Sequence, residues 1–168
     1  MTIIARSLCI LLISATIGAE AADTALPADS TVSARLLRAL RYADTQRATI
    51  TGLCQRTPEL KKTLAACHKA ESVPDDVIEN LAIPYVSKYI SKSEAHDAIA
   101  FWESPSGKEI VRVMLIGIKT NNPNLLSNAQ LALLDQFNHS EANSALIRFG
   151  KDSALLSQVI RTFSAYEP

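Results

Sequence analysis

The sequence lacks the patterns on which most recognised catalytic sites depend. Its 168 residues include only five glycines and three histidines, and they contain no glycine-rich phosphate loop, Gly-x-Ser-x-Gly turn, Ser-x-x-Lys pair or HExxH zinc motif. The formal net charge is zero, so the basic excess that is typical of nucleic-acid-binding proteins is missing. We therefore expect a protein that is not an enzyme, binds no nucleic acid and uses no metal or cofactor.

The apolar stretch at the start of the chain is too short for a transmembrane helix, which needs about 20 residues. Residues 1–21 combine a basic Arg6, an apolar segment over 8–17 and a small-x-small sequence at 19–21, the pattern of a cleavable secretory signal. We expect cleavage after Ala21 and a periplasmic or secreted protein with no stable membrane insertion afterwards. A retained membrane anchor is the alternative.

Cysteine is also scarce, with three in the chain. Signal cleavage would remove Cys9 and leave Cys54 and Cys67, an even pair in an oxidising compartment. We predict that these two form a disulfide, which would stabilise the fold by roughly 3 kcal/mol. The alternative is a metal site formed by Cys54, Cys67 and His68, but adjacent helical residues rarely chelate one ion together and a fourth ligand is missing.

The remaining chain is predicted to form one all-α domain. Residues 22–30 are small, polar and proline-bearing, which favours a flexible mature N-terminus. Apolar residues recur at helical spacing over 31–168, no Gly/Ser/Pro-rich linker divides this range, and its length suits a single core. We therefore expect a helical bundle of six to eight helices.

The N-terminal half is predicted to contain three helices. The first spans about 31–55, with Arg47 interrupting its apolar stripe and needing a carboxylate or the solvent edge. The second spans about 57–70, and the disulfide would staple it to the first as a hairpin. The third begins near Ser72, and Pro84 is expected to kink or break it.

Residues 91–118 are predicted to form two helices joined at Ser104-Pro105. A capping-box pattern at Ser91 and Glu94 begins the first helix, and proline is well suited to the first position of the second. Glycine at position 107 is unfavourable in a helix by roughly 1 kcal/mol, which indicates that another backbone passes close by.

The second of these helices is almost continuously apolar over residues 110–118. A helix that is apolar nearly all round is a buried helix, so we expect it at the centre of the core. A buried strand is the alternative, because periodicity does not separate the two for a short apolar run.

The sequence Phe-Trp-Glu-Ser-Pro-Ser-Gly-Lys at 101–108, preceded by Ser91 and Glu94, resembles the signature of a bacterial family of exported helical proteins, domain of unknown function 2059. The family pattern is a Ser/Thr-capped helix that ends in Phe-aromatic, followed by Ser-Pro-x-Gly-Lys. The match covers this stretch well and the flanking helices only in general character, and Trp102 stands where tyrosine is usual. The resemblance implies an α-helical fold and export, and it implies no catalytic residue.

A fainter copy of this stretch follows at a constant offset of 36 residues. The residues that return in order are Ser127, Gln130, Phe137 and Ser140. They repeat the capping box, the aromatic residue near the helix end and the second serine cap. We therefore expect two similar Ser-capped hairpins over 84–118 and 124–150, with chance similarity between amphipathic helices as the alternative.

The candidate interaction surface lies where the two helices of 91–118 meet. It comprises Trp102, Ser104, Ser106, Gly107 and Lys108. Backbone N–H groups at a helix start can bind an anion, and an exposed tryptophan can anchor a partner, whereas a tight helix corner and core packing are the structural alternatives. The leading hypothesis is a protein-binding module that engages another envelope protein, for instance as an inhibitor.

Two further hypotheses come from other functional classes. A carrier of a small apolar ligand or lipid would need a cavity lined by Val113, Met114, Ile116 and Phe137. A hydrolase would need an acid and a base in one concave site, drawn from Glu94, Asp97 and Glu103.

Overall fold

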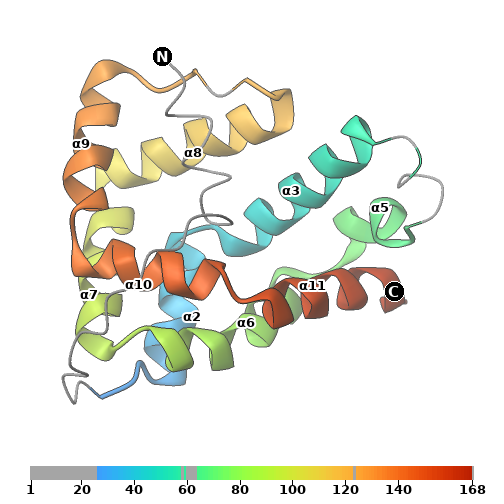
Figure 1. Ribbon diagram of the computed structural model, residues 1–168, viewed down its shortest axis with the longest axis horizontal. Coiled ribbons are helices and arrows are strands. Elements are labelled where there is room, and N and C mark those ends of the chain that lie inside the picture. The colour runs from blue at the N-terminus through green and yellow to red at the C-terminus, as the bar shows by residue number, and fades with distance from the viewer. Residues whose placement is uncertain (1–25, 58, 60–63, 123, 168) are drawn as a thin grey trace.

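The computed structural model describes residues 26–57, 59, 64–122 and 124–167 (Figure 1). In these ranges the regular structure is helical, apart from one isolated β-bridge between Pro27 and Ser91, so the predicted all-α fold class is confirmed. The nine α-helices of these ranges exceed the six to eight that were expected. The helices are α2 (Ser30–Ala39), α3 (Tyr42–Arg56), α5 (Ala66–Lys69), the 3-10 turn η1 (Ala70–Ser72), α6 (Asp75–Tyr89), α7 (Lys92–Glu103), α8 (Pro105–Thr120), α9 (Asn128–Asn138), α10 (Glu141–Gly150) and α11 (Ser153–Ala165). The signal sequence predicted over 1–21 lies outside the described residues.

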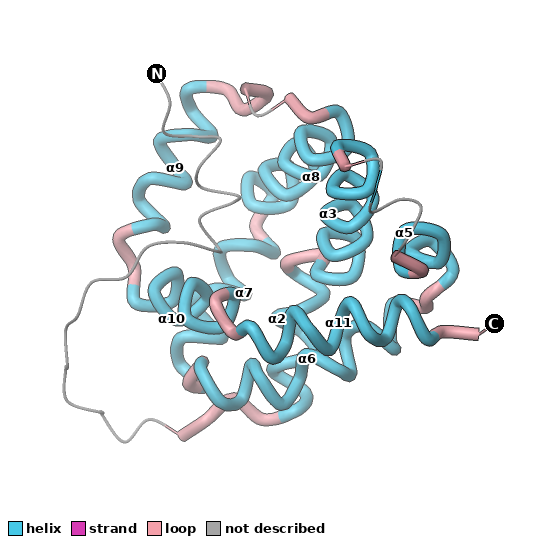
Figure 2. Tube along the Cα trace, turned by 45° about the vertical axis from the view of Figure 1, so that its right-hand side comes forward, coloured by secondary structure: helices cyan, strands magenta, loops and turns pink. Residues whose placement is uncertain are grey.

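The core is built around α2 and α6. Helix α2 packs against α6 and α7, while α6 also contacts α3, α10 and α11. Leu36 and Leu37 of α2 and Ile78 of α6 are fully buried, and each such side chain stabilises the fold by about 1.5–3 kcal/mol. Figure 2 shows α11 running across α6 toward α5 at the end of the chain.

The single long helix expected over 31–55 is wrong, because the chain bends between α2 and α3. Arg41 adopts a left-handed conformation with φ 48°, which costs a non-glycine residue about 1–2 kcal/mol. Its guanidinium pairs with Asp44 at 2.6 Å, and its carbonyl accepts a hydrogen bond from the Thr45 hydroxyl. The bend lets α2 pack on α6 and α7 while α3 turns to pack on α8 and α5.

Arg47, which interrupts the apolar stripe of α3, pairs with a carboxylate as expected, while its Nε is buried without a hydrogen-bond partner among the described residues. Its side chain is only 12% exposed, and its guanidinium donates to the Asp75 carboxylate and to the Val73 carbonyl. The arginine therefore ties the middle of α3 to the start of α6.

The predicted disulfide between Cys54 and Cys67 is present, with the two Cα atoms 5.8 Å apart. It joins the end of α3 to α5. The continuous helix expected over 57–70 is not observed in the described part of that range. Leu64 and Ala65 are not helical, and α5 begins only at Ala66.

Residues 26–30 do not form the flexible segment that was expected over 22–30. Ala28 is 2% exposed, and its N–H donates to the carbonyl of Ile90, while the N–H of Lys92 donates to the carbonyl of Leu26. Asp29 then caps α2 through the N–H of its third residue. These backbone hydrogen bonds hold residues 26–28 against the junction between α6 and α7.

Helix α6 continues through Pro84 without a break. Pro84 and Asn80, whose carbonyl loses its helical donor, both face solvent, so water can satisfy the freed group.

The expectation that residues 110–118 form the central, wholly buried helix is wrong. In α8 the buried apolar side chains are Ile110, Val111 and Leu115, and Ile116 is 39% exposed. The helix lies along the upper edge of the molecule beside α3 (Figure 1). Among the described residues, no helix is long and apolar enough to cross a membrane.

Removing the disulfide should destabilise the fold without changing its helical content under native conditions. We expect the double variant Cys54→Ala/Cys67→Ala to lose about 2–4 kcal/mol of unfolding free energy, because its unfolded chain regains the freedom of the closed loop. Urea denaturation followed by circular dichroism measures the loss. Reductant should shift the wild-type curve toward that of the variant and leave the variant unchanged; equal midpoints for oxidised wild type and variant would contradict this.

Asp152 links α6 to α11 through several hydrogen bonds. Its carboxylate accepts from the Tyr89 hydroxyl at 2.7 Å, from the Lys88 ammonium at 3.2 Å and from the N–H groups of Ala154 and Leu155 at the start of α11. These donors, the Tyr89 hydroxyl first, lower the pKa of Asp152 to about 2.

Stability should therefore depend on the charge of Asp152 in acid. A carboxyl with a lowered pKa stabilises the fold fully above its unfolded pKa near 3.8 and loses this effect as the pH falls to about 2. We expect wild type to melt at a higher temperature than Asp152→Asn between about pH 5 and 7, and the difference to shrink as the pH falls from about 4 toward about 2. Thermal melts across this range measure it, with the exposed Asp97→Asn as the control; a constant difference down to pH 2 would sink the assignment.

Candidate functional site

The corner between α7 and α8 is built by Ser104 and Gly107. The Ser104 hydroxyl donates to the Phe101 carbonyl at 2.6 Å and accepts from the N–H of Gly107 at 3.0 Å. A Cβ placed on Gly107 would lie 2.1 Å from the Phe101 carbonyl oxygen and 2.9 Å from the Trp102 Cα. The close backbone approach expected at Gly107 is therefore confirmed, and only glycine permits it.

The caps expected at an offset of 36 residues are also observed. Capping boxes form at both Ser91 and Ser127. Ser140 bonds the Phe137 carbonyl and the N–H three residues on, as Ser104 does at the first corner. The two equivalent phenylalanines stack on each other, with ring centroids 4.2 Å apart and planes 11° apart.

Trp102 is mainly a core residue. It is 6% exposed and meets the rings of Phe101 and Phe137 edge-on, at centroid distances of 4.8 and 5.3 Å. Its indole N–H is buried without a hydrogen-bond partner among the described residues, which costs about 1–3 kcal/mol. The side chain thus fixes α7 against α9, and the exposed remainder faces the cleft described next.

A cleft of about 580 Å³ opens beside this corner. Its walls come from α2, the bend after it, the end of α7 and the first half of α8. The lining residues are Arg38, Ala39, Arg41, Trp102, Glu103, Lys108, Val111 and Arg112. We call it the Trp102 cleft: an apolar floor with a charged rim.

The rim consists of one carboxylate, Glu103, and four cations: Arg38, Arg41, Lys108 and Arg112. The cleft is therefore positive although the whole chain is neutral. Arg35 donates two hydrogen bonds to Glu103 and lowers the pKa of that carboxyl, which keeps it ionised and paired. Arg41, in the bend, pairs with Asp44 in the first turn of α3, and Arg112 pairs with Glu109 of its own helix, α8.

Two rim cations are available to a ligand. Arg38 and Lys108 make no ion pair within 4 Å among the described residues. Among the described residues the Arg38 guanidinium donates only to the carbonyl of Ala34. Partial burial raises the pKa of Glu79, and the charge of Arg38 opposes this only in part.

The predicted interaction surface is therefore divided between two roles. Trp102 and Lys108 line the cleft, whereas Ser104 and Gly107 build the corner. Ser106 is exposed in the first turn of α8. The N–H of Gly107 is taken by the serine cap, so the geometry favours the corner over an anion site on the backbone.

Sequence reasoning predicted Lys108 but missed three cations of the cleft: Arg38 of α2, Arg41 of the bend and Arg112 of α8. Arg35, Arg38 and Arg41 recur every three residues, which places them on one side of a helix. That spacing was the available signal. Arg112 carries no such signal, because its position opposite α2 depends on the corner at Gly107.

The carboxylates of the hydrolase hypothesis do not share a site. Glu94 accepts from the backbone of Ser91 and from Arg148, while Glu103 pairs with Arg35 at the other end of α7, about 13 Å away along the helix axis. Asp97 is exposed between them. Among the described residues, no group of three or more metal-ligating side chains converges either.

Neither of the two described pockets is the apolar cavity that the carrier hypothesis requires. Neither the Trp102 cleft nor the smaller pocket described below includes the four residues proposed to line it. Those residues are Val113, Met114, Ile116 and Phe137.

Comparisons of the chain with protein-family models, with curated proteins and with solved structures find no match. Function is therefore inferred from the residues and geometry of the chain itself.

Two glycines should respond oppositely to alanine. Gly107→Ala forces a Cβ into the Phe101 carbonyl and should cost about 1–3 kcal/mol of unfolding free energy. Gly52→Ala in α3, where a Cβ would meet no atom closer than 3.8 Å, should be neutral or stabilise by up to about 1 kcal/mol. Chemical denaturation of both variants measures the contrast; a stable Gly107→Ala protein would refute the close approach.

Proposed function

We propose that the protein is an exported, non-enzymatic binding module of the bacterial envelope that holds an acidic segment of a partner protein in the Trp102 cleft. The observation that carries the proposal is the set of four cations around an apolar floor, two of them without an ion pair among the described residues.

The chemistry of the cleft favours a peptide with acidic side chains on either side of an apolar one. The floor residues Ala39, Trp102 and Val111 suit an apolar side chain, and guanidinium groups such as that of Arg38 pair well with carboxylates. Exposed ion pairs contribute only about 0.2–1 kcal/mol each, so the apolar anchor must supply much of the affinity. The rim charges would mainly steer association.

The size of the cleft agrees with this occupant. Ligand pockets commonly measure about 300–1,000 Å³, and a volume of about 580 Å³ accommodates a few side chains rather than a folded domain. An inhibitor of another envelope protein is one form that such a module can take.

The cellular setting is part of the proposal. The signal pattern over 1–21 and the resemblance of residues 101–108 to the exported family, domain of unknown function 2059, both support export. The disulfide between Cys54 and Cys67 is of the kind that persists in an oxidising compartment such as the periplasm.

The test uses Trp102, the only tryptophan of the chain, as the reporter. A short tryptophan-free peptide with glutamates flanking one phenylalanine is titrated into the protein, and the same peptide with lysines in place of glutamates is the control. We expect a saturable change in tryptophan fluorescence with the acidic peptide only, weakening as salt is raised because the rim is exposed.

Charge reversal at the rim locates the binding site. Arg38→Glu and Lys108→Glu should each weaken binding of the acidic peptide about tenfold, equivalent to about 1.4 kcal/mol. Arg161→Glu makes the same charge change on the exposed face of α11, which packs against α5 and α6, and should leave binding unchanged. Equal weakening by all three variants, or no binding by wild type, would overturn the proposal.

A further inference from the structure

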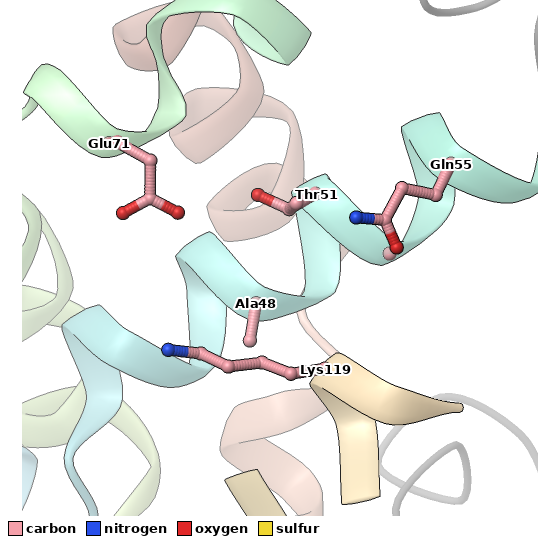
Figure 3. Close-up of a pocket in the computed structure, with 6 residues that line it drawn as sticks. Ala48, Thr51, Gln55, Glu71 and Lys119 are labelled. Atoms are coloured by element: carbon pink, nitrogen blue, oxygen red, sulfur yellow. The ribbon is translucent and has the colours of Figure 1, made fainter. Parts of the chain in front are cut away.

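A second, smaller pocket lies between α3, η1 and the last turn of α8. It has a volume of about 210 Å³ and is lined by Ala48, Thr51, Gly52, Gln55, Glu71 and Lys119. Figure 3 shows these side chains reaching the space from three separate elements of the fold. We call it the Gly52 pocket.

The pocket brings together one full negative charge and one full positive charge. Glu71 comes from η1 and Lys119 from α8, and neither makes an ion pair, with the other or with any further described residue. In Figure 3 the Thr51 hydroxyl is turned toward the Glu71 carboxylate, and the Lys119 side chain runs beside Ala48. Two opposite charges that face a shared space without meeting leave room for a molecule that carries both.

Gly52 lines the pocket and adds no side chain to it. This residue is buried in the interior of α3, where glycine is unfavourable. A Cβ at this position would lie in ordinary van der Waals contact, at 3.8 Å, with the Arg56 guanidinium and the Ile118 carbonyl oxygen, and the φ of Gly52 is not positive. Packing and backbone conformation therefore tolerate alanine at this position, whereas a larger side chain would narrow the pocket that Gly52 lines.

The three walls of the pocket are fixed to one another. The disulfide holds α5, directly before η1, to the end of α3. Arg56 at the end of α3 donates to the side chain of Asn121, which caps α8, at 3.2 Å, and α3 packs along α8. The backbone that carries Glu71 and Lys119 is therefore already held in place before a ligand binds.

We propose that the Gly52 pocket binds a small zwitterion of the amino-acid class. Glu71 accepts hydrogen bonds from the ligand ammonium, Lys119 donates to its carboxylate, and Thr51 and Gln55 complete the polar contacts. The small volume restricts the ligand to a few non-hydrogen atoms beyond its charged groups. This site is separate from the Trp102 cleft and does not rest on the proposed function.

The probes are glycine, β-alanine, γ-aminobutyrate and 6-aminohexanoate, whose ammonium and carboxylate groups are progressively further apart. Binding is followed by calorimetry and by the backbone amide NMR signals of Thr51, Gly52 and Gln55. We expect saturable binding that peaks at one charge separation. Butylamine and butyrate each lack one charge and should bind about tenfold more weakly or worse, because one charge-assisted hydrogen bond is lost.

Charge exchange provides the decisive comparison. Glu71→Lys and Lys119→Glu should each weaken binding of the best zwitterion at least about tenfold. The double variant Glu71→Lys/Lys119→Glu should recover most of it, because the ligand can bind in the reverse direction. Glu141→Lys, an exposed change on α10, serves as the matched control and should have no effect.

Further variants separate this site from the Trp102 cleft and from chance. Gly52→Leu should fill the pocket and abolish binding, while Lys108→Glu should leave zwitterion binding intact even where it weakens the acidic peptide. The proposal is overturned when wild type shows no saturable binding, when the single charge reversals bind as wild type does, or when the double exchange fails to bind better than either single variant.

Discussion

The contact of Gly107 with the backbone of Phe101 and Trp102 sets the geometry on which the candidate site depends. Because no Cβ intervenes, α8 leaves the end of α7 at a tight corner, and its first turns face α2 instead of extending into solvent. Lys108, Val111 and Arg112 thereby become walls of the Trp102 cleft. The stacked rings of Phe101 and Phe137 hold the other side of α7 against α9, so the corner is braced from both directions.

The bend at Arg41 supplies the opposite wall. A straight helix in place of α2 and α3 could not pack on α6 and α7 with its first half and on α8 and α5 with its second. The conformational cost at Arg41 is offset by its ion pair with Asp44 and by burial of the apolar faces that the bend makes compatible. One consequence is that a basic stripe on α2 comes to lie opposite the basic start of α8. A neutral chain thus acquires a positive cleft, with Arg35 and Glu103 neutralising each other at its border.

Local patterns predicted much of the fold because they rest on interactions between residues a few positions apart. The capping box at Ser91, the proline start of α8 and the close approach at Gly107 are all of this kind, and the disulfide followed from counting cysteines. The misses depend on distant contacts. No glycine or proline marks the bend at Arg41. Residues 26–28 are held by backbone hydrogen bonds to Ile90 and Lys92, and side-chain patterns do not predict such bonds. The cleft was only half predicted for the same reason: Arg38 and Lys108 meet only once α2, α7 and α8 have packed.

Helix α8 connects the two proposed sites physically. Its first half lines the Trp102 cleft, and Lys119 in its last turn lines the Gly52 pocket, while α3 packs along its length. Since α8 is buried on only one side, its position is set mainly by the corner at Gly107 and by the face of α3. Any displacement of α8 on that face would move Lys108 relative to Arg38 and Lys119 relative to Glu71 together. The two sites are chemically different, since one is cationic and the other has mixed charge. Both nevertheless depend on the packing of α8 against α3. A helix at the edge of the fold therefore matters as much to the proposed binding as the helices at its centre.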